Sequence, residues 1–342
     1  YRQLPARAPS FTSVRLPNAG YLIQRTGWEP TDLYLLLNAV PYGGGHSHPD
    51  SLSLDVFGYG SLLLTDSGRE NYNHPLHREY FRKTRAHNVL QIDGLEQPHN
   101  LATEVVAWRV EPAWEHAAGR VAYAGFQHRR DVLFLKPRAW LVVDHVSGDG
   151  RHHLEQWWHF PPGEAAVDAP KLAVRSTRPK GANLEILAAG PNGLQARLDE
   201  GWIGFRAGGS VKAPVGVFAC EASLPVSLAW LLVPRRTDDT SPASIARVPV
   251  SEKGAPVGES RAAAWRVRLG DEYFVAGVAY QPGEFECEGF RWNDAVLVQR
   301  LEEGSKAARR DPSLHHGDRP AGDPSSDVFS SAKERGESGP LG

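Results

Sequence analysis

The sequence predicts an all-β protein, a large antiparallel β-sandwich. Short runs rich in Val, Leu, Tyr, Trp and Phe recur along the 342 residues, and 34 Gly and 26 Pro repeatedly separate them, which is typical of many strands joined by turns. Several of these runs alternate apolar and polar residues with the period of a half-buried strand. No long amphipathic helix is evident, although residues 75–82 are expected to form a short one.

The strands can be placed in order along the chain. The first is expected at residues 21–25. Apolar residues at 52, 54 and 56 alternate with polar ones, and a Gly-Tyr-Gly turn leads into the apolar run 61–66, so a hairpin is expected here. Further strands are expected at residues 87–93, 103–110, 130–135, 140–145 and 152–160 and, from a weaker pattern, at 184–187, 202–206, 226–233, 263–269 and 273–279.

The two ends of the chain differ from its middle. Residues 303–342 contain four large apolar side chains among Gly, Pro, Ser and charged residues, too few to offset the entropy of ordering, so a disordered tail is expected. The sequence contains no Met, so residue 1 is not a translation start. Residues 1–20 are therefore expected to lead from an absent N-terminal part into a sandwich over residues 21–302.

Composition excludes several classes of protein. The 38 Lys and Arg residues nearly balance the 40 Asp and Glu residues, for a net charge of −2, whereas a nucleic-acid binder normally presents a strongly basic face. No run approaches the roughly 20 apolar residues of a membrane helix. Two cysteines, Cys220 and Cys287, are too few for a disulfide scaffold. They form either one disulfide or two buried free thiols.

Histidines cluster in one part of the chain and suggest a metal site. Six of the fourteen lie between His46 and His99, and the densest run is Gly-Gly-Gly-His-Ser-His-Pro-Asp at 43–50. On a strand, the side chains two residues apart at 46 and 48 would point to the same side. If the strands that end at Asp66 and begin at His87 are neighbours, these two residues and His48 suit Zn²⁺ with water or another group as fourth ligand. The alternative is a set of separately hydrogen-bonded histidines.

The run at 46–50 is also similar to the His-x-His-x-Asp motif of metallo-β-lactamase-like hydrolases. That family places another His directly after the Asp, where this chain has Ser51. Its fold alternates strands and helices, and few helices are predicted here. This interpretation is therefore disfavoured.

A longer set of linked motifs carries a closer resemblance. They are Gly-His-Ser-His-Pro-Asp-Ser-Leu-Ser at 45–53, Leu-Thr-Asp-Ser-Gly-Arg at 64–69 with Tyr72, Arg-Ala-His-Asn at 85–88 and Asp-Gly at 93–94, with weaker matches at 157–159, 200–202 and 230–234. In this order and spacing they resemble the C-terminal half of the heparinase II/III family of polysaccharide lyases. The resemblance implies a β-sandwich packed against an α/α toroid of helices that is missing from this sequence.

The resemblance also implies an activity and a set of site residues. Members of that family cleave uronic-acid-containing polysaccharides by β-elimination: a base removes the C5 proton, a group neutralises the uronate carboxylate, and an acid protonates the leaving oxygen. By resemblance, His46 is a catalytic residue and His48, Asp66 and His87 bind a structural zinc. Tyr72 matches an active-site Tyr of some alginate-active members.

The separate roles of His46, as a catalytic residue, and His48, as a metal ligand, are chemically reasonable. A metal occupies the lone pair of its ligand, whereas a proton-transfer group needs its own lone pair free, and imidazole exchanges protons near neutral pH. The alternative for His46 is a residue that only shapes the site. Arg69 and Arg85 are candidates for binding substrate carboxylates through their forked guanidinium groups. Their alternative is structural pairing with acidic residues, namely Asp50, Asp66 or Glu79.

Other residues near these motifs have simpler expected roles. Asn88 is expected to secure the loop beside the metal ligand by hydrogen bonds. Trp157 and Trp158 either stack on sugars or belong to the core. His74, His77 and His99 lie in predicted loops and receive no role.

The leading hypothesis is the C-terminal sandwich part of a zinc-containing polysaccharide lyase that acts on an acidic polysaccharide. The resemblance favours the periplasm, the cell envelope or secretion as its location. The competing hypothesis is a non-catalytic carbohydrate-binding or exopolysaccharide-assembly module that retains the zinc site. The particular polymer is not predicted, because the missing helices would build much of the sugar-binding cleft.

Overall fold

The computed structural model describes residues 7–40, 44–205 and 208–301 and confirms the predicted all-β class. Its strands form five sheets, and all strand pairings within the described sheets are antiparallel. The predicted disordered tail lies outside the described residues. None of the described helices is long and apolar enough to cross a membrane.

Three sheets build the larger part of the molecule. One has its strands in chain order: β1 (Val14–Leu16), β2 (Tyr21–Arg25), β3 (Tyr34–Asn38), β4 (Leu54–Gly58) and β5 (Ser61–Leu64). The eight-stranded sheet has the order β12 (Ala165–Asp168), β13 (Ala173–Ser176), β14 (Asn183–Ala189), β17 (Val226–Arg235), β10 (Ala139–Ser147), β9 (Phe126–Leu135), β8 (Trp114–Tyr123) and β7 (Glu104–Val110). The third consists of β15 (Gln195–Gly204), β16 (Ser210–Ser223), β11 (Arg151–His159) and β6 (Leu90–Ile92).

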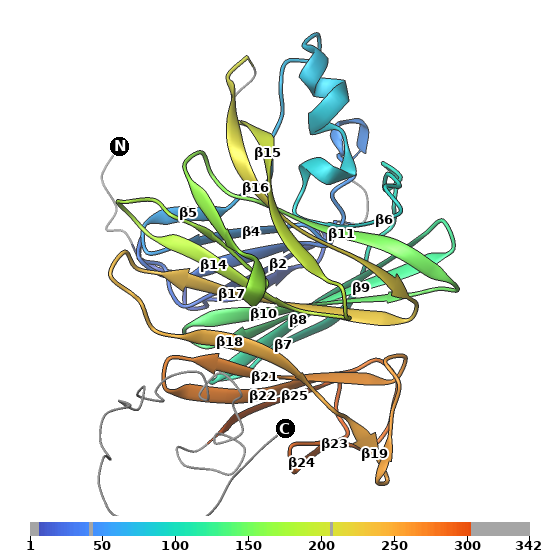
Figure 1. The fold of residues 1–342 in the computed structure, drawn as a ribbon. Helices are drawn as coiled ribbons and strands as arrows, with labels where there is room; N and C mark the ends of the chain where they lie inside the picture. Colours follow the sequence, from blue (N-terminus) through green and yellow to red (C-terminus); the bar gives the residue numbers. More distant parts are fainter. Residues whose placement is uncertain (1–6, 41–43, 206–207, 302–342) are drawn as a thin grey trace, which may run out of the picture.

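Two further sheets follow in the C-terminal part, coloured orange in Figure 1. One has the order β18 (Ala243–Val248), β21 (Ala262–Leu269), β22 (Glu272–Ala279) and β25 (Val296–Leu301). The other is small and has the order β20 (Ala255–Pro256), β19 (Ser251–Glu252), β23 (Phe285–Cys287) and β24 (Phe290–Trp292).

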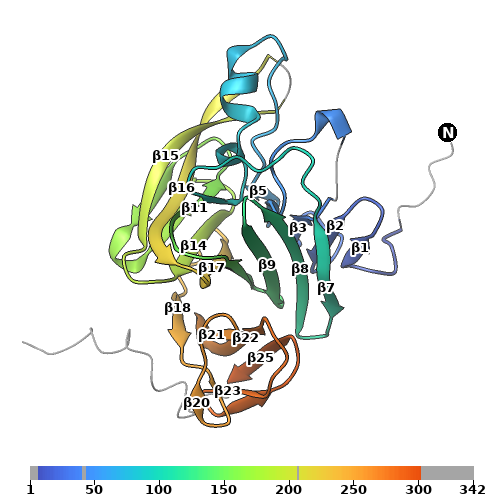
Figure 2. The same ribbon diagram turned by 90° about the vertical axis from the view of Figure 1, so that its right-hand side faces the viewer.

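The eight-stranded sheet is the middle layer and is covered on both faces (Figures 1 and 2). Strand β10 shows this arrangement. On one face, Trp140 and Val142 pack against the sheet of β1 to β5 and the sheet that contains β11 and β16. On the other face, Leu141 and Val143 pack against β21 and β22. Successive side chains of a strand point to opposite faces, so a stretch of strand that is covered on both sides can be apolar at consecutive positions. This explains why residues 140–143 form a continuous apolar run.

The described residues contain four short helices: η1 (Gly44–His46), η2 (His77–Phe81), η3 (Thr84–Ala86) and η4 (Ala169–Lys171). The π-helix η2 confirms the predicted short helix. The condition that His46 and His48 lie on one strand is not met, because His46 ends the helix η1 and no strand of the described residues includes His48. Strand β4 begins only at Leu54.

Both cysteines are buried free thiols, so the disulfide alternative is wrong. Cys220 packs in the core between the eight-stranded sheet and its N-terminal neighbours, whereas Cys287 packs in the core between the two C-terminal sheets. The layers between them separate the two side chains.

A fully buried ion pair crosses the core between the eight-stranded sheet and β11. Arg130 donates from Nε and Nη2 to the two carboxylate oxygens of Asp144 at 2.7 and 2.8 Å, and from Nη2 to Gln156 at 2.5 Å. Its Nη1 donates to the carbonyl oxygens of Leu52 and Asn88 at 2.7 and 2.8 Å. All five guanidinium N–H groups are therefore satisfied.

The carboxylate of this pair is equally well satisfied. Asp144 accepts further hydrogen bonds from His128 Nε2 and Trp230 Nε1, each at 2.7 Å. Burial alone would raise the pKa of Asp144, but Arg130 and His128 hold it well below its usual range. The pair is thus charged on both sides in a dry core, which requires this complete set of partners.

Removing one member of this pair should be costly. We expect Arg130→Met to lower the free energy of unfolding by about 3–5 kcal/mol, because Asp144 would remain charged and buried without its main partner. Arg120→Met is the matched control, since its ion pair with Glu104 on β8 and β7 is exposed, and such pairs contribute at most about 1 kcal/mol. Urea unfolding followed by tryptophan fluorescence measures both. Equal losses in the two variants would contradict this account.

Candidate active site and metal centre

The predicted site residues come from three loop segments at one end of the sandwich, near η1 and η2 (Figure 2). Asn88 ties these segments together. Its Nδ2 donates to the carbonyl oxygens of Leu54 and Thr65 at 2.7 and 3.0 Å, and its Oδ1 accepts from the backbone N–H of His159 at 2.7 Å. This confirms the predicted role of Asn88.

The structure brings His48, Asp66 and His87 together. Their ligand atoms all lie within 4.8 Å of one another. A tetrahedral zinc ion places its ligand atoms roughly 3.4 Å apart, so modest side-chain rotation would close the set. His87 presents its Nδ1 to the Asp66 carboxylate, so this nitrogen and a carboxylate oxygen are placed to share one cation. The donor set therefore fits Zn²⁺.

One contact within this cluster links a ligand to its carboxylate. Asp66 Oδ2 lies 2.6 Å from His87 Nδ1, and Asp66 Oδ1 accepts from the backbone N–H of Gly68 at 2.8 Å. Burial opposes charge on both side chains, but their mutual attraction outweighs it, so the pKa of Asp66 is lowered and the pKa of His87 is raised. This contact fixes the orientation of the His87 ring towards Asp66.

The pKa values of three side chains near Asp66 and His87 are also shifted. Burial, together with the charge of His87, lowers the pKa of His48 to about 4, so its imidazole is neutral and the lone pair of its unprotonated nitrogen is available to a metal. Burial raises the pKa of Asp50 and of Asp55 to about 6 each, with the negative charge of Asp66 adding to the effect. A cation bound by His48, Asp66 and His87 would offset this concentration of buried acid groups.

A second group of residues lies next to the metal ligands. The hydroxyl of Tyr72 lies 2.9 Å from His46 Nδ1. Both side chains line one pocket with His48 and Arg69. Tyr72 is 52% exposed, and His46 and Arg69 are also exposed, in contrast to the fully buried His87. This pair is therefore open to a ligand from solvent.

The structure does not bring Arg85 to this pocket. Its guanidinium lies 6.0 Å from the ring centroid of Tyr80, and Arg85 is not among the residues that line the pockets around His46. Neither Arg69 nor Arg85 has an ion pair within the described residues, so the alternative of structural pairing with Asp50, Asp66 or Glu79 is wrong.

The two tryptophans near His159 belong to the core. Trp158 is fully buried and Trp157 is 8% exposed, so sugar stacking by these rings is excluded in this arrangement. His159 is also buried, and its Nε2 lies 2.9 Å from the hydroxyl of Tyr80. Burial lowers the pKa of His159 to about 3, so its role is a neutral hydrogen-bonding one.

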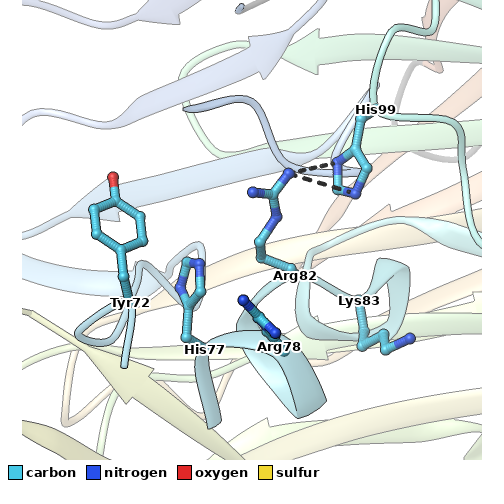
Figure 3. A pocket seen from close by; sticks show the side chains of 6 residues that line it. All are labelled: Tyr72, His77, Arg78, Arg82, Lys83 and His99. Atoms are coloured by element: carbon cyan, nitrogen blue, oxygen red, sulfur yellow. Dashed lines mark hydrogen bonds between the residues drawn. The ribbon is translucent and has the colours of Figure 1, made fainter. Parts of the chain in front are cut away.

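Sequence reasoning missed a cationic pocket that adjoins the His46–Tyr72 pair. It is lined by Tyr72, His77, Arg78, Arg82, Lys83 and His99 (Figure 3). Two of these residues, His77 and His99, had been left without a role. The spacing of two arginines four residues apart on a predicted short helix was the signal that could have indicated one basic face.

The fold and this site define an antiparallel β-sandwich protein that carries a candidate His-Asp-His metal centre beside an exposed His–Tyr pair. The model of the heparinase II/III-like, C-terminal family matches residues 8–242. The chain belongs to this family. The match ends just before β18, so the two C-terminal sheets lie beyond it.

Similar proteins support the same assignment. The chain is 27% identical over 224 residues to the heparin-sulfate lyase of Pedobacter heparinus, covering 62% of this chain and 33% of that protein. It is 22% identical over 201 residues to the heparin-sulfate lyase of Bacteroides stercoris, covering 57% of this chain and 30% of that protein. The chain thus spans about a third of the length of these relatives.

Solved structures show the same fold. A heparinase III structure aligns with a TM-score of 0.68 at 20% identity, covering 86% of this chain and 43% of that one. The heparan sulfate lyase HepC of Pedobacter heparinus aligns with a TM-score of 0.70 at 22% identity, covering 80% of this chain and 44% of that one. The predicted resemblance and the predicted sandwich are both confirmed.

Zinc should stabilise the chain through His87. Because the ligands converge only in the folded state, bound zinc adds to stability; at 100 times Kd this is about 2.7 kcal/mol, or roughly 4 °C in Tm for a chain of this size. We expect His87→Ala to abolish the difference in Tm between zinc-loaded and chelated protein, and His153→Ala, an exposed histidine on β11, to retain it. Differential scanning calorimetry gives the Tm values.

The zinc affinity should also depend on pH. A proton competes with the metal for His87, whose pKa is raised, so affinity should fall as the pH drops through that pKa. Elemental analysis that finds no zinc in protein purified without chelator and given equimolar zinc, or a zinc-dependent Tm that survives in His87→Ala, would contradict the assignment.

Proposed function

We propose that this chain is the C-terminal sandwich part of a polysaccharide lyase that cleaves a uronic-acid-containing glycan by β-elimination. The observation that carries the proposal is the His46–Tyr72 hydrogen bond of 2.9 Å, exposed to solvent beside Arg69. The names of the relatives, heparin-sulfate lyases, support a substrate of this class.

The chemistry of the pair suits the proposed reaction. β-Elimination needs one group that takes the C5 proton and one that protonates the leaving oxygen. In this proposal the pair carries out one of these two transfers: the hydroxyl accepts the C5 proton from the sugar while its own proton passes to the ring nitrogen. In this proposal Tyr72 meets the sugar and His46 holds the transferred proton. Arg69 binds the uronate carboxylate through its guanidinium.

The metal centre has a separate role in the proposal. Zinc bound by His48, Asp66 and His87 would be structural, linking the segment before β4, the segment after β5 and the segment after η3. These residues hold the loop that carries His46 in position beside Tyr72. In this proposal His46 is not a ligand, since the cluster of ligand atoms does not include it and its Nδ1 lies against the hydroxyl of Tyr72.

The rest of the cleft would come from an upstream helical domain. The chain covers 43% and 44% of the length of two solved lyase structures that it resembles in fold, and we propose that an α/α toroid supplies the remaining proton-transfer and carboxylate-neutralising groups. In this proposal residues 21–302 form the sandwich that packs against the toroid. We place the enzyme in the periplasm, at the cell envelope or outside the cell, where acidic polysaccharides occur.

His46 should be dispensable for folding and important for turnover. In the enzyme that includes the helical domain, we expect His46→Ala and Tyr72→Phe each to lower kcat by about 10²- to 10⁴-fold, the usual effect of losing a general acid or base, with no change in Tm. The absorbance of the unsaturated product measures turnover. Normal eliminase activity in His46→Ala would show that this residue only shapes the site.

The chain expressed alone should bind zinc and have little or no lyase activity. Elimination requires base, neutraliser and acid to converge on one sugar, and holding them together contributes roughly 7–11 kcal/mol to lowering the barrier. We expect residues 1–342 to release no unsaturated product from alginate, heparan sulfate, hyaluronan or glucuronan, and addition of the helical part to restore activity. Robust turnover by the chain alone would mean that it holds a complete active site. Inactivity of the reassembled protein would favour a non-catalytic binding module.

A further inference from the structure

The cationic pocket beside Tyr72 has the features of a binding site that the lyase chemistry does not itself require. Its volume is about 450 Å³, and η2 and the residues around it supply most of its lining. Tyr72, His77 and Arg82 line both this pocket and the one that contains His46. The two cavities therefore adjoin, and Arg78 and Lys83 line only the one that does not contain His46.

The positive charge of this pocket is not neutralised by the protein. Within the described residues, neither Arg78 nor Arg82 has a carboxylate partner, and the pocket lining contains no acidic side chain. Lys83 has a single ion pair, an exposed one with Glu96 at 3.6 Å. Unpaired guanidinium groups that line a cavity attract oxyanions, which they bind through two parallel N–H groups.

The pocket is also ordered by contacts among its own residues. Arg82 Nη2 lies 3.2 Å from His99 Nδ1 and 3.4 Å from the carbonyl oxygen of Ser47 (Figure 3 shows the contact with His99). His77 is 5% exposed, and its Nδ1 is buried without a hydrogen-bond partner in the described part of the chain. Burial and the nearby arginines lower the pKa of His77, which is consistent with a positive potential here.

We propose that Arg78 and Arg82 form a subsite for an oxyanion, sulfate or carboxylate, on the sugar next to the one that is cleaved. This inference rests on the proposed lyase function and adds a determinant of substrate choice to it. Arg69 lines the pocket that contains His46 and His48, where the uronate carboxylate of the cleaved sugar belongs. Arg78 lines the adjoining pocket and not the one that contains His46 and Arg69, so in this proposal it meets the neighbouring sugar.

The test compares three oligosaccharides of equal length that differ at the neighbouring sugar. Heparosan alternates glucuronate with an uncharged N-acetylglucosamine, N-sulfated heparosan carries a sulfate there, and oligoglucuronate carries a carboxylate there. Calorimetric titration of the zinc-loaded full chain at constant ionic strength gives the three affinities. We expect one or both of the charged-neighbour ligands to bind about tenfold more tightly than heparosan, and the ligand that gains shows which oxyanion the subsite takes.

Arg78→Gln is the decisive variant, because Arg78 is exposed and, in the part of the chain that the structure describes, has no partner whose loss would disturb the fold. It should remove the tenfold advantage and leave the affinity for heparosan unchanged. Arg151→Gln, which removes an exposed arginine at the far end of β11 from His159, is the matched control and should retain the advantage. Equal affinities for all three ligands in the unmodified chain, or an advantage that survives in Arg78→Gln, would overturn the subsite.

A chain that binds none of the three ligands would count against the proposed glycan substrate, and inorganic sulfate then decides the subsite separately. We expect sulfate to shift the Arg78 Nε–H resonance saturably in NMR spectra at constant ionic strength. The absence of such a shift would overturn the proposal.

Discussion

The buried pair of Arg130 and Asp144 is the interaction on which the rest of the structure depends. A charged guanidinium in a dry core is tolerated only when every N–H has an acceptor, and two of these acceptors are the backbone carbonyls of Leu52 and Asn88. Asn88 directly follows His87. The pair thus fixes, from the centre of the sandwich, the loops that carry the metal ligands, and stability of the core and geometry of the site are linked through one side chain.

The site itself separates buried charge from exposed chemistry. Asp66 contacts the fully buried His87 while its own side chain remains 30% exposed, which favours a fixed cation site that solvent can still reach. His46 and Tyr72 are in contact at the surface of the same loops, where a sugar could reach them. The two pockets that Tyr72 lines contain Arg69, Arg78 and Arg82 and no carboxylate. These pockets are therefore positive, whereas the neighbouring candidate metal centre is rich in acidic side chains. This arrangement suits an anionic polymer.

The sequence predicted those features that local pattern determines. The hairpin of β4 and β5 follows from alternation and a Gly-containing turn, and the apolar run at 140–143 marks a strand covered on both faces. The arrangement of His46 and His48 did not follow from two-residue spacing, because the glycines before them allow a helical turn there instead of a strand. Arg130 was not singled out, since its role depends on partners 14 to 78 residues away. Arg78 and Arg82 were missed for the same reason. Their spacing indicates that they share one face of a helix, but not which other segments of the chain line a pocket with that face.

The central claim is that His48, Asp66 and His87 hold one metal ion while His46 stays free to pair with Tyr72. Anomalous diffraction at the zinc edge, from crystals of the zinc-loaded chain, tests this most directly. The account predicts a single peak within bonding distance of a nitrogen of His48, a nitrogen of His87 and an oxygen of Asp66, with the His46–Tyr72 contact retained. A peak on His46, or no peak at these three residues, would contradict it.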